Sequence, residues 1–249
     1  MTYCVGLLTA EGLVMIADTR TNAGLDNVAT FQKLHRFEIP GDRTITIATA
    51  GNLAVSQAAI SLMSDGFENP ETGLLETIYD HPTMFRTAAY VGRAINEVMR
   101  LNRGASASMG ASLDVTMLVG GQVKGGRLRL FMVYSAGNFI EATEDTPYLQ
   151  IGEHKYGKPI LDRAITHETN LSDGLKIALI SMDSTMRSNL GVGMPIDMWV
   201  SRRDSLSTLI STRIEQGEPY FHDLRERWSA ALRSAHQAIP APPYLPDQG

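Results

Sequence analysis

The sequence predicts an α+β fold in which two antiparallel sheets pack face to face and pairs of helices cover them on the outside. Blocks of strand-like segments alternate with blocks of helix-like segments, which favours antiparallel sheets over repeated strand–helix–strand units. The length of 249 residues suffices for one large hydrophobic core. Because no internal repeat or linker-like stretch is found, we predict a single domain over residues 1–249.

The beginning of the chain shows the period of strands. Short runs of apolar or β-branched residues are separated by clusters of Gly, Pro, Asn and Asp. The predicted strands cover residues 3–9, 13–19, 33–39 and 44–50, and a loop is predicted over residues 21–30. The second run is apolar on both faces and contains Asp18 near its end, which is typical of a buried strand carrying one carboxylate.

After residue 51 the apolar residues recur at helical spacing, and strand signals then return. The central segments are predicted as helices 52–65 and 82–101, a Gly, Ala and Ser-rich loop 104–112, and strands 114–120, 127–134 and 139–142. The later segments are predicted as helices 160–163 and 171–186, strands 195–200 and 205–215, a long amphipathic helix 219–239, and a Pro-rich tail 240–249.

Composition excludes several classes of protein. The formal net charge is −5 and no run of Lys and Arg offers a surface for phosphates, so we expect no nucleic-acid partner. The single cysteine, Cys4, rules out an internal disulfide and suits a reducing compartment. No apolar stretch of about 18 residues indicates a membrane span, and no secretory signal is found, so we expect a cytoplasmic protein.

Motif searches narrow the chemistry further. Phosphate-loop, dinucleotide-binding, zinc-protease and serine-hydrolase motifs do not occur in the sequence. The six histidines are scattered without the spacing of metal ligands. We therefore expect neither a metal ion nor a cofactor.

The residue that offers nucleophilic chemistry is Thr2, directly behind Met1. Threonine is small enough that removal of the initiator methionine is expected, which would place a hydroxyl and a free α-amine on one residue. The ordinary pKa of an α-amine, about 7.7–8.0, makes it a base near neutral pH, and a threonine hydroxyl needs such a base. The alternative is that Thr2 has no chemical role, since Met-Thr starts are common.

Three neighbouring residues give Thr2 a chemical context. Asp18 ends the second strand and Lys33 opens the third, so the two could pair, and a lysine held beside the amine would lower the pKa of amine and hydroxyl alike. The alternative is a surface ion pair worth less than about 1 kcal/mol. Gly51, at a strand-to-helix junction, could donate its N–H to an oxyanion or could be an ordinary turn glycine.

These residues carry a resemblance. Thr2 before a strand, the segment Ala17-Asp18-Thr19-Arg20-Thr21, Lys33 and the segment Thr49-Ala50-Gly51 resemble the proteasome β-subunit family of N-terminal-nucleophile hydrolases. The match covers nearly the whole chain, from residue 2 to residue 239, and its strings 1–8, 155–163 and 181–193 are most similar to the bacterial ancestral β-subunits of that family. The resemblance implies a four-layer αββα sandwich.

The resemblance also implies a role for each matching position. Thr2 would be the nucleophile and, through its amine and a water, the general base. Asp18 would orient Lys33, and Lys33 would tune the proton affinity of the Thr2 hydroxyl. Gly51 would donate to the oxyanion, and Ser188 matches a serine that supports the terminal amine.

Three further positions match the primary specificity pocket of the family. They are Thr21, Thr49 and Leu53, which imply a modest and mostly neutral pocket.

The sequence departs from the family in residues that support the site. The spacing from Asp18 to Lys33 is one residue shorter than in the proteasome itself, so the loop between them must differ. The family's supporting aspartate is replaced by Thr185, and the nearby Asp183 is displaced. Where relatives carry Gly-Ser-Gly, this chain has a glutamate, Glu153, which either replaces the supporting serine or faces solvent. These changes put turnover in doubt, because supporting residues hold a site in its geometry.

Three functions remain open. The first is a threonine peptidase that assembles with copies of itself into a ring or a ring-like spiral and acts on peptides or proteins. The second is an amidase with a narrow substrate, because a shared nucleophile does not fix the substrate. The third is an assembly scaffold with a vestigial site. The sequence identifies no ATPase partner.

The roles of the C-terminal segment and of Cys4 each have two possible interpretations. The C-terminal helix 219–239 and the tail 240–249 exceed the usual β-subunit and serve either packing or contact between subunits. Cys4 lies two residues after Thr2, as a packing residue or as an oxidation-sensitive neighbour of the site.

Overall fold

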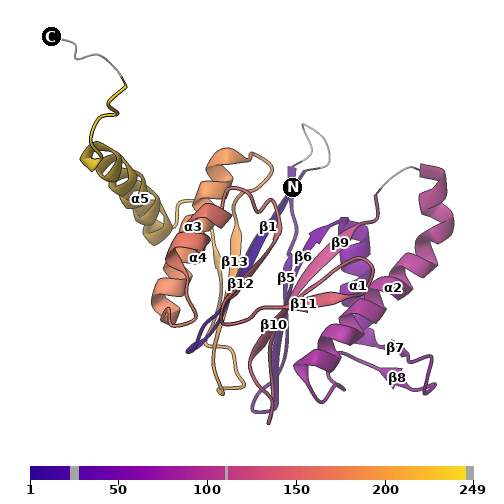
Figure 1. Cartoon of the computed structure of the whole chain (residues 1–249). Helices are drawn as coiled ribbons and strands as arrows, with labels where there is room; N and C mark the ends of the chain where they lie inside the picture. The colour runs from indigo at the N-terminus through magenta and orange to yellow at the C-terminus, as the bar shows by residue number, and fades with distance from the viewer. Residues whose placement is uncertain (23–27, 110–111, 245–249) are drawn as a thin grey trace. The chain divides into compact units, whose positions relative to one another are not determined.

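The computed structural model describes residues 1–22, 28–109 and 112–244 and divides into two compact units (Figure 1). The first unit is Met1–Gln216 and the second is Gly217–Gly249. In the first unit, two five-stranded sheets face each other and helices cover both outer faces. The predicted α+β sandwich with antiparallel sheets is therefore confirmed.

The first sheet contains the beginning of the chain at its centre. Its strands, in spatial order, are β12 (Tyr148–Gly152), β1 (Tyr3–Leu8), β2 (Gly12–Asp18), β13 (Ile196–Arg202) and β14 (Ile210–Ile214). Every residue of β1 and β2 is buried, because one face meets the second sheet and the other meets helices. Such a strand reads as a continuous apolar run instead of an alternating one.

The second sheet is built around the strand that ends in Gly51. Its strands, in spatial order, are β11 (Phe139–Glu141), β10 (Arg129–Val133), β9 (Val115–Val123), β6 (Arg43–Gly51) and β5 (Leu34–Ile39). In β6 the isoleucines Ile45 and Ile47 face the helices, and Ala48 and Ala50 face the first sheet. The small side chains on that inner face let the two sheets pack closely.

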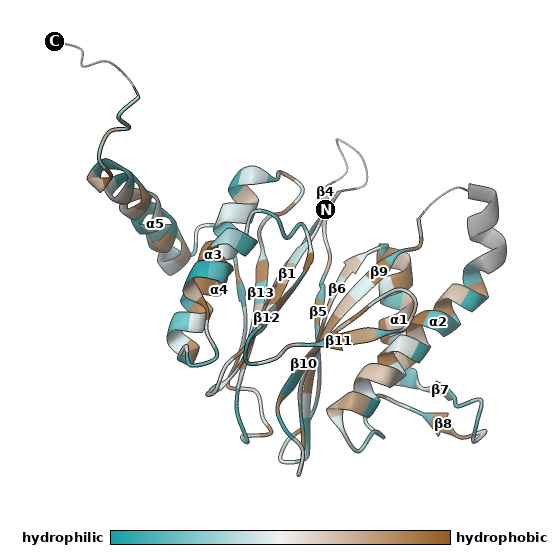
Figure 2. Cartoon of the chain, in the orientation of Figure 1, coloured by the Kyte–Doolittle hydropathy of each residue, from teal (hydrophilic) through white to brown (hydrophobic). Residues whose placement is uncertain are grey.

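Two pairs of helices complete the layers. They are α1 (Leu53–Asp65) and α2 (Met84–Met109) over the second sheet, and α3 (Lys158–Ala164) and α4 (Leu171–Ser188) beside the first. Apolar and hydrophilic bands alternate along α2 and α4, whereas the strands between the layers are largely apolar (Figure 2). The helices α2 and α4 therefore each bury one face on a sheet and expose the other.

Several short or weakly patterned elements differ from the sequence-based predictions. The predicted loop 21–30 contributes to a small hairpin of β3 (Arg20–Asn22) and β4 (Val28–Thr30). The loop predicted over 104–112 is wrong up to Met109, where α2 ends, and residues 110 and 111 lie outside the described part. The strand β12 and the hairpin of β7 (Phe67–Glu68) and β8 (Leu75–Glu76) were not predicted.

In the described residues 217–244, the second unit forms the helix α5 (Pro219–Ala238), close to its predicted bounds. The Glu218 carboxylate caps it by accepting hydrogen bonds from the N–H groups of Tyr220 and Phe221. Of the predicted tail, residues 245–249 lie outside the described part. Within the ranges that the structure covers, no helix combines the length and the apolar character that a membrane span needs.

Candidate active site

Thr2 lies at the point where the chain enters β1. The Glu153 N–H donates to the Thr2 carbonyl at 2.7 Å. Gly152 also packs tightly here, since an added Cβ would sit 2.0 Å from the Thr2 oxygen, and its φ of +83° favours glycine. The main chain of Thr2 is therefore fixed by the residues that follow β12, and its side chain shares a face with Cys4 by the alternation of a strand.

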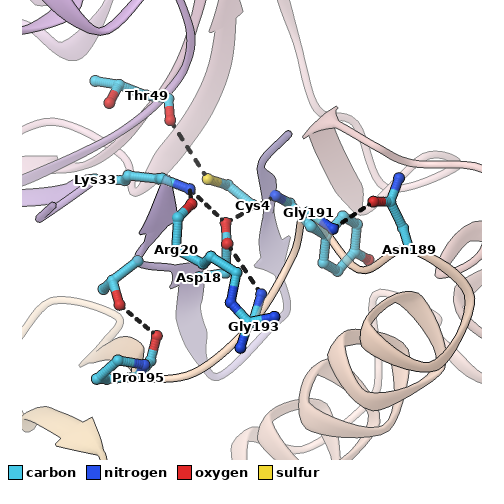
Figure 3. A network of polar contacts seen from close by, with 11 residues as sticks. Cys4, Asp18, Arg20, Lys33, Thr49, Asn189, Gly191, Gly193 and Pro195 are labelled. Atoms are coloured by element: carbon cyan, nitrogen blue, oxygen red, sulfur yellow. Dashed lines mark hydrogen bonds and ion pairs between the residues drawn. The ribbon is translucent and has the colours of Figure 1, made fainter. Parts of the chain in front are cut away.

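Asp18 and Lys33 form a buried ion pair beneath this entry point (Figure 3). Lys33 Nζ donates to Asp18 Oδ1 at 2.9 Å and to the Arg20 carbonyl at 2.6 Å. Asp18 is fully buried and Lys33 is 4% exposed, so the alternative of a surface ion pair is wrong.

The remaining donors to Asp18 come from the main chain. The Tyr3 N–H donates to Oδ1 at 3.0 Å, and the Gly193 N–H donates to Oδ2 at 3.3 Å. Burial raises the pKa of the Asp18 carboxyl above its ordinary value, while the Lys33 ammonium and the two N–H groups oppose that rise. The Asp18 carboxylate thus connects Lys33, which precedes the strand β5, with the start of β1 and with the loop after α4.

Cys4 packs in the core between the sheets. It is fully buried, and its Sγ lies 3.7 Å from the Thr49 carbonyl. Burial is the main cause that raises the pKa of the thiol, with the Asp18 charge next. A buried thiol that stays protonated is a poor nucleophile, so the geometry favours the packing interpretation of this residue.

The side chain of Tyr3 points the opposite way, toward α4. Its hydroxyl donates to Ser181 Oγ at 3.0 Å and accepts from Gln150 Nε2 at 2.6 Å. Desolvation raises the pKa of this phenol. These contacts fix the start of β1 from the helical side, and the sequence offered no signal for them beyond an aromatic residue in a strand.

Glu153 does not face solvent. It is 7% exposed, and its Oε2 accepts from Asn189 Nδ2 at 3.0 Å. The Lys155 ammonium lies 3.4 Å from Oε1. The alternative of a solvent-facing Glu153 is therefore wrong, and the carboxylate connects the residues after β12 to the loop after α4.

The other two predicted supporting residues lie in α4. Ser188 is the last residue of α4 and is exposed. Asp183 is buried in α4 and pairs with Arg187 at 3.0 Å. Thr185, in the family's aspartate position, donates its hydroxyl back to the Ser181 carbonyl of its own helix.

The loop after α4 was missed as a structural part of the site. The Asn189 side chain accepts from the Gly191 N–H at 2.9 Å (Figure 3). Arg20 donates to the Leu190 carbonyl at 3.0 Å. A Cβ on Gly193 would lie 2.3 Å from the Arg20 guanidinium, and one on Gly191 would lie 2.6 Å from Met1 Cβ. The two glycines of Gly-Val-Gly were the available signal, because only a residue without a side chain fits such close approaches.

The remaining predicted positions lie along β6 and α1. Gly51 ends β6 with φ +108°, and a Cβ there would sit 2.2 Å from the Asp114 carbonyl. The Thr49 N–H donates to the Lys33 carbonyl at 2.9 Å, and Leu53 is the first residue of α1. Thr21 lies in β3, and its enclosed hydroxyl has no hydrogen-bond partner among the described residues.

Taken together, the geometry places Thr2, Asp18, Lys33 and Glu153 in one connected region. It also leaves Ser188 outside the hydrogen bonds that connect them. Among the described residues, no group of three or more His, Cys, Asp and Glu side chains is arranged to hold a metal ion.

Comparison with known proteins identifies the family. The proteasome subunit family model matches residues 2–200. The structure resembles Anbu, described as an ancestral β-subunit, from Yersinia bercovieri, with 41% identity, a TM-score of 0.88, and coverage of 98% of this chain and 100% of that one. Anbu from Hyphomicrobium sp. strain MC1 shares 44% identity with a TM-score of 0.85 over 96% of this chain and 98% of the other.

A third similar structure is described as a helical assembly of the Anbu complex from Pseudomonas aeruginosa. It shares 44% identity, with a TM-score of 0.89 over 97% of this chain and 98% of that one. The search of curated proteins found no match. With most of its length matched by the family and with these identities over nearly the whole chain, the protein belongs to the proteasome subunit family, in its Anbu group of ancestral β-subunits.

Proposed function

We propose that this chain is a threonine hydrolase subunit that cleaves peptide bonds, with Thr2 as nucleophile once Met1 is removed. The observation that carries the proposal is a shared oxygen. Asp18 Oδ1 accepts both the Tyr3 N–H, at 3.0 Å, and Lys33 Nζ, at 2.9 Å. The peptide unit between Thr2 and Tyr3 and the Lys33 ammonium are therefore both anchored to one buried atom.

The chemistry follows from that arrangement. The Thr2 amine takes the hydroxyl proton, directly or through a water, and Oγ attacks the carbonyl carbon of the substrate. The positive charge of Lys33 favours the deprotonated hydroxyl, and the Gly51 N–H stabilises the tetrahedral oxyanion. The carbon–nitrogen bond then breaks, the amine leaves with a proton, and water hydrolyses the ester on Oγ to restore Thr2.

This mechanism requires hydrolysis of the peptide bond between Met1 and Thr2. Met1 is 61% exposed and its side chain lies against Gly191. While Met1 is attached, the Thr2 nitrogen belongs to an amide and cannot act as a base. Removal of Met1 frees the amine and uncovers Gly191 in the same step.

We also propose that the subunit acts within a homo-oligomer in the cytoplasm, as a ring or a ring-like spiral. The Pseudomonas aeruginosa relative is described as a helical assembly. In α5, Leu232 is 52% exposed and Ile239, next to its end, is 70% exposed. Apolar side chains of this kind are better buried in a contact between subunits than left in water.

The second candidate is a scaffold whose site does not turn over. The exposed position of Ser188 favours it, because a serine that supports a terminal amine has to reach that amine. The two candidates differ in the state and reactivity of Thr2, and two measurements separate them.

The first measurement is the intact mass of protein purified from its native host. Loss of the Met1 mass supports the hydrolase, and retention of Met1 on the native protein contradicts it. The second is labelling by an electrophile directed at N-terminal threonine. Thr2→Ala should abolish the label, and labelling that survives this substitution rejects Thr2 as the nucleophile.

Lys33→Ala extends this test to the ion pair. The labelling rate should fall by orders of magnitude while assembly persists. Lys176→Ala, at a half-exposed lysine on α4, is the matched control and should label at the normal rate. Equal rates for the two variants would deny Lys33 its proposed role.

A further inference from the structure

A groove of about 480 Å³ follows the free edge of β12, the outermost strand of the first sheet. Its opposite wall is the inner face of the second sheet, represented by Thr116, Met132 and Tyr134. That face is the inner one because Met132 packs on the core between the sheets, and Tyr134 follows it by two residues in the chain. In Figure 1, β12 lies beside β10 on this side of the sandwich.

One end of the groove lies at the candidate active site. Gly152 lines the groove, and a Cβ on it would sit 2.0 Å from the Thr2 carbonyl oxygen. On the opposite wall, Thr116 is paired with Ala50, the residue before Gly51. One end of the groove therefore lies next to the main chain of Thr2 and next to the strand position that is paired with the residue before Gly51.

The hydrogen-bond pattern of β12 leaves main-chain groups free on this edge. In an antiparallel ladder, bonded and non-bonded pairs alternate along the strand. The bonded pairs with β1 include the Glu153 N–H with the Thr2 carbonyl and the Leu8 N–H with the Pro147 carbonyl, both 2.7 Å. Odd-numbered residues of this strand region thus face β1, and even-numbered residues turn their N–H and C=O groups to the free edge.

The even-numbered residues are Tyr148, Gln150 and Gly152, and all three line the groove. The Gly152 carbonyl already accepts from the His154 N–H at 3.1 Å. The main-chain groups of Tyr148 and Gln150 have no partner within the described residues. Unpaired groups on a strand edge form a template for another strand.

We propose that the free edge of β12 binds the leaving-group segment of a peptide substrate as an added antiparallel strand. The proposal rests on the proposed function, because it places the scissile bond at Thr2. The leaving segment has its amino end at Thr2 and runs from Gly152 toward Tyr148, opposite to β12. Four steps of about 3.4 Å along this edge take a segment of about five residues.

The opposite wall gives this subsite a preference. Side chains of an added strand alternate, so every second one meets Met132 and Tyr134, both of which are half-buried. At the far end, Lys158 is already engaged by the Asp162 carboxylate at 2.7 Å and by the Tyr148 hydroxyl at 3.0 Å. The subsite is therefore suited to extended segments with apolar side chains at alternate positions, with no demand for charge.

The test uses the full-length Thr2→Ala protein and a six-residue peptide of alternating Val and Thr with a free amino end, labelled at its carboxyl end. Fluorescence anisotropy should show saturable binding. Methylating one peptide nitrogen at a time should raise Kd about fivefold at every second position and leave the others nearly unchanged, since only alternate amides face β12. This period of two does not depend on the register in which the peptide binds.

Variants of the wall provide the controls. Tyr134→Ala should raise Kd about tenfold, and Tyr220→Ala, at an exposed tyrosine on α5, should not change it. Methylation effects without alternation, or a Kd that Tyr134→Ala leaves unchanged, would overturn the proposal. So would the absence of binding at millimolar peptide, the result expected if another copy of the chain covers this edge.

A final comparison separates this inference from the proposed function. An electrophile that lacks a leaving-group segment should label Thr2 equally in the native-sequence and Tyr134→Ala proteins. Cleavage of peptides should accelerate with leaving-group length up to about five residues, and Tyr134→Ala should remove that gain. Alternating binding without any labelling would reject Thr2 as nucleophile but keep the β12 site, whereas labelling without alternation would reject the site alone.

Discussion

Replacing Lys33 with Met should destabilise the fold far more than loss of a surface charge. The substitution removes the ammonium 2.9 Å from Asp18 Oδ1 and keeps a side chain of similar length. The carboxylate stays fully buried, and among the described residues its remaining donors are the N–H groups of Tyr3 and Gly193. Breaking a buried pair by removing one partner costs about 3–5 kcal/mol, whereas an exposed pair contributes less than about 1 kcal/mol.

That cost predicts a shift in Tm that calorimetry can resolve. For a chain of this size each kcal/mol moves Tm by about 2–4 °C, so Lys33→Met should melt about 10 °C lower at neutral pH. The assay is differential scanning calorimetry at a fixed protein concentration, because assembly also shifts Tm. A decrease in Tm under about 2 °C at neutral pH would refute the reasoning, because loss of a surface ion pair would produce a shift of that size.

The direction of the Asp18 pKa shift predicts how the stability of the variant changes with pH. Burial raises the pKa of Asp18 in the folded protein, and without Lys33 one of the main opposing effects is gone. A folded carboxyl with a raised pKa binds its proton more tightly than the unfolded one, so its contribution to stability is lost as pH rises through the folded pKa. The deficit of Lys33→Met should therefore be smaller at pH 5 than at pH 8, and Asp18→Asn added to it should recover part of the stability.

Three further changes test other parts of the site. Gly152→Ala should lower Tm by more than Gly125→Ala, because both have positive φ but only Gly152 would bring a Cβ to within 2.0 Å of the Thr2 carbonyl; equal shifts in calorimetry would contradict that close approach. Tyr3→Phe removes a buried hydroxyl with two partners and should cost about 1 kcal/mol in denaturant unfolding. Cys4 should resist iodoacetamide in the native protein and react after unfolding, as mass spectrometry can show, because it is fully buried and its thiol pKa is raised.

The parts of the fold that the sequence predicted are those with a strong local pattern. The fully buried β1 and β2 appear as apolar runs, and the helix predicted over residues 52–65 is close to α1. The strand β12 was not predicted, because it is short and lies at a sheet edge. The extension of α2 to Met109 passes through residues with weak helix propensity, which an established helix can still include at a cost of about 1 kcal/mol for a glycine.

The residues of the candidate site also fall into those that a local sequence pattern identifies and those that it does not. Asp18 and Lys33 were identifiable because they flank predicted strands, but their burial depends on how the two sheets pack, which no local pattern reports. Asn189 was beyond prediction for a different reason, because its partner Glu153 lies 36 residues away in the chain. The Gly-Val-Gly string indicated a close approach at Gly193 but not its partner Asp18, which lies 175 residues away.

The cost of the buried pair bears on why it exists. Replacing both partners of a buried ion pair with well-packed apolar residues is often neutral or stabilising, so the fold itself gains little from Asp18 and Lys33. The pair nevertheless draws in the N–H groups of Tyr3 and Gly193, and thereby joins the start of β1 to the loop after α4. In the proposed function, the positive charge of Lys33 favours the deprotonated Thr2 hydroxyl. We infer that the proposed chemistry at Thr2 accounts for the pair better than stability does, and a double variant that folds well but does not label would separate the two.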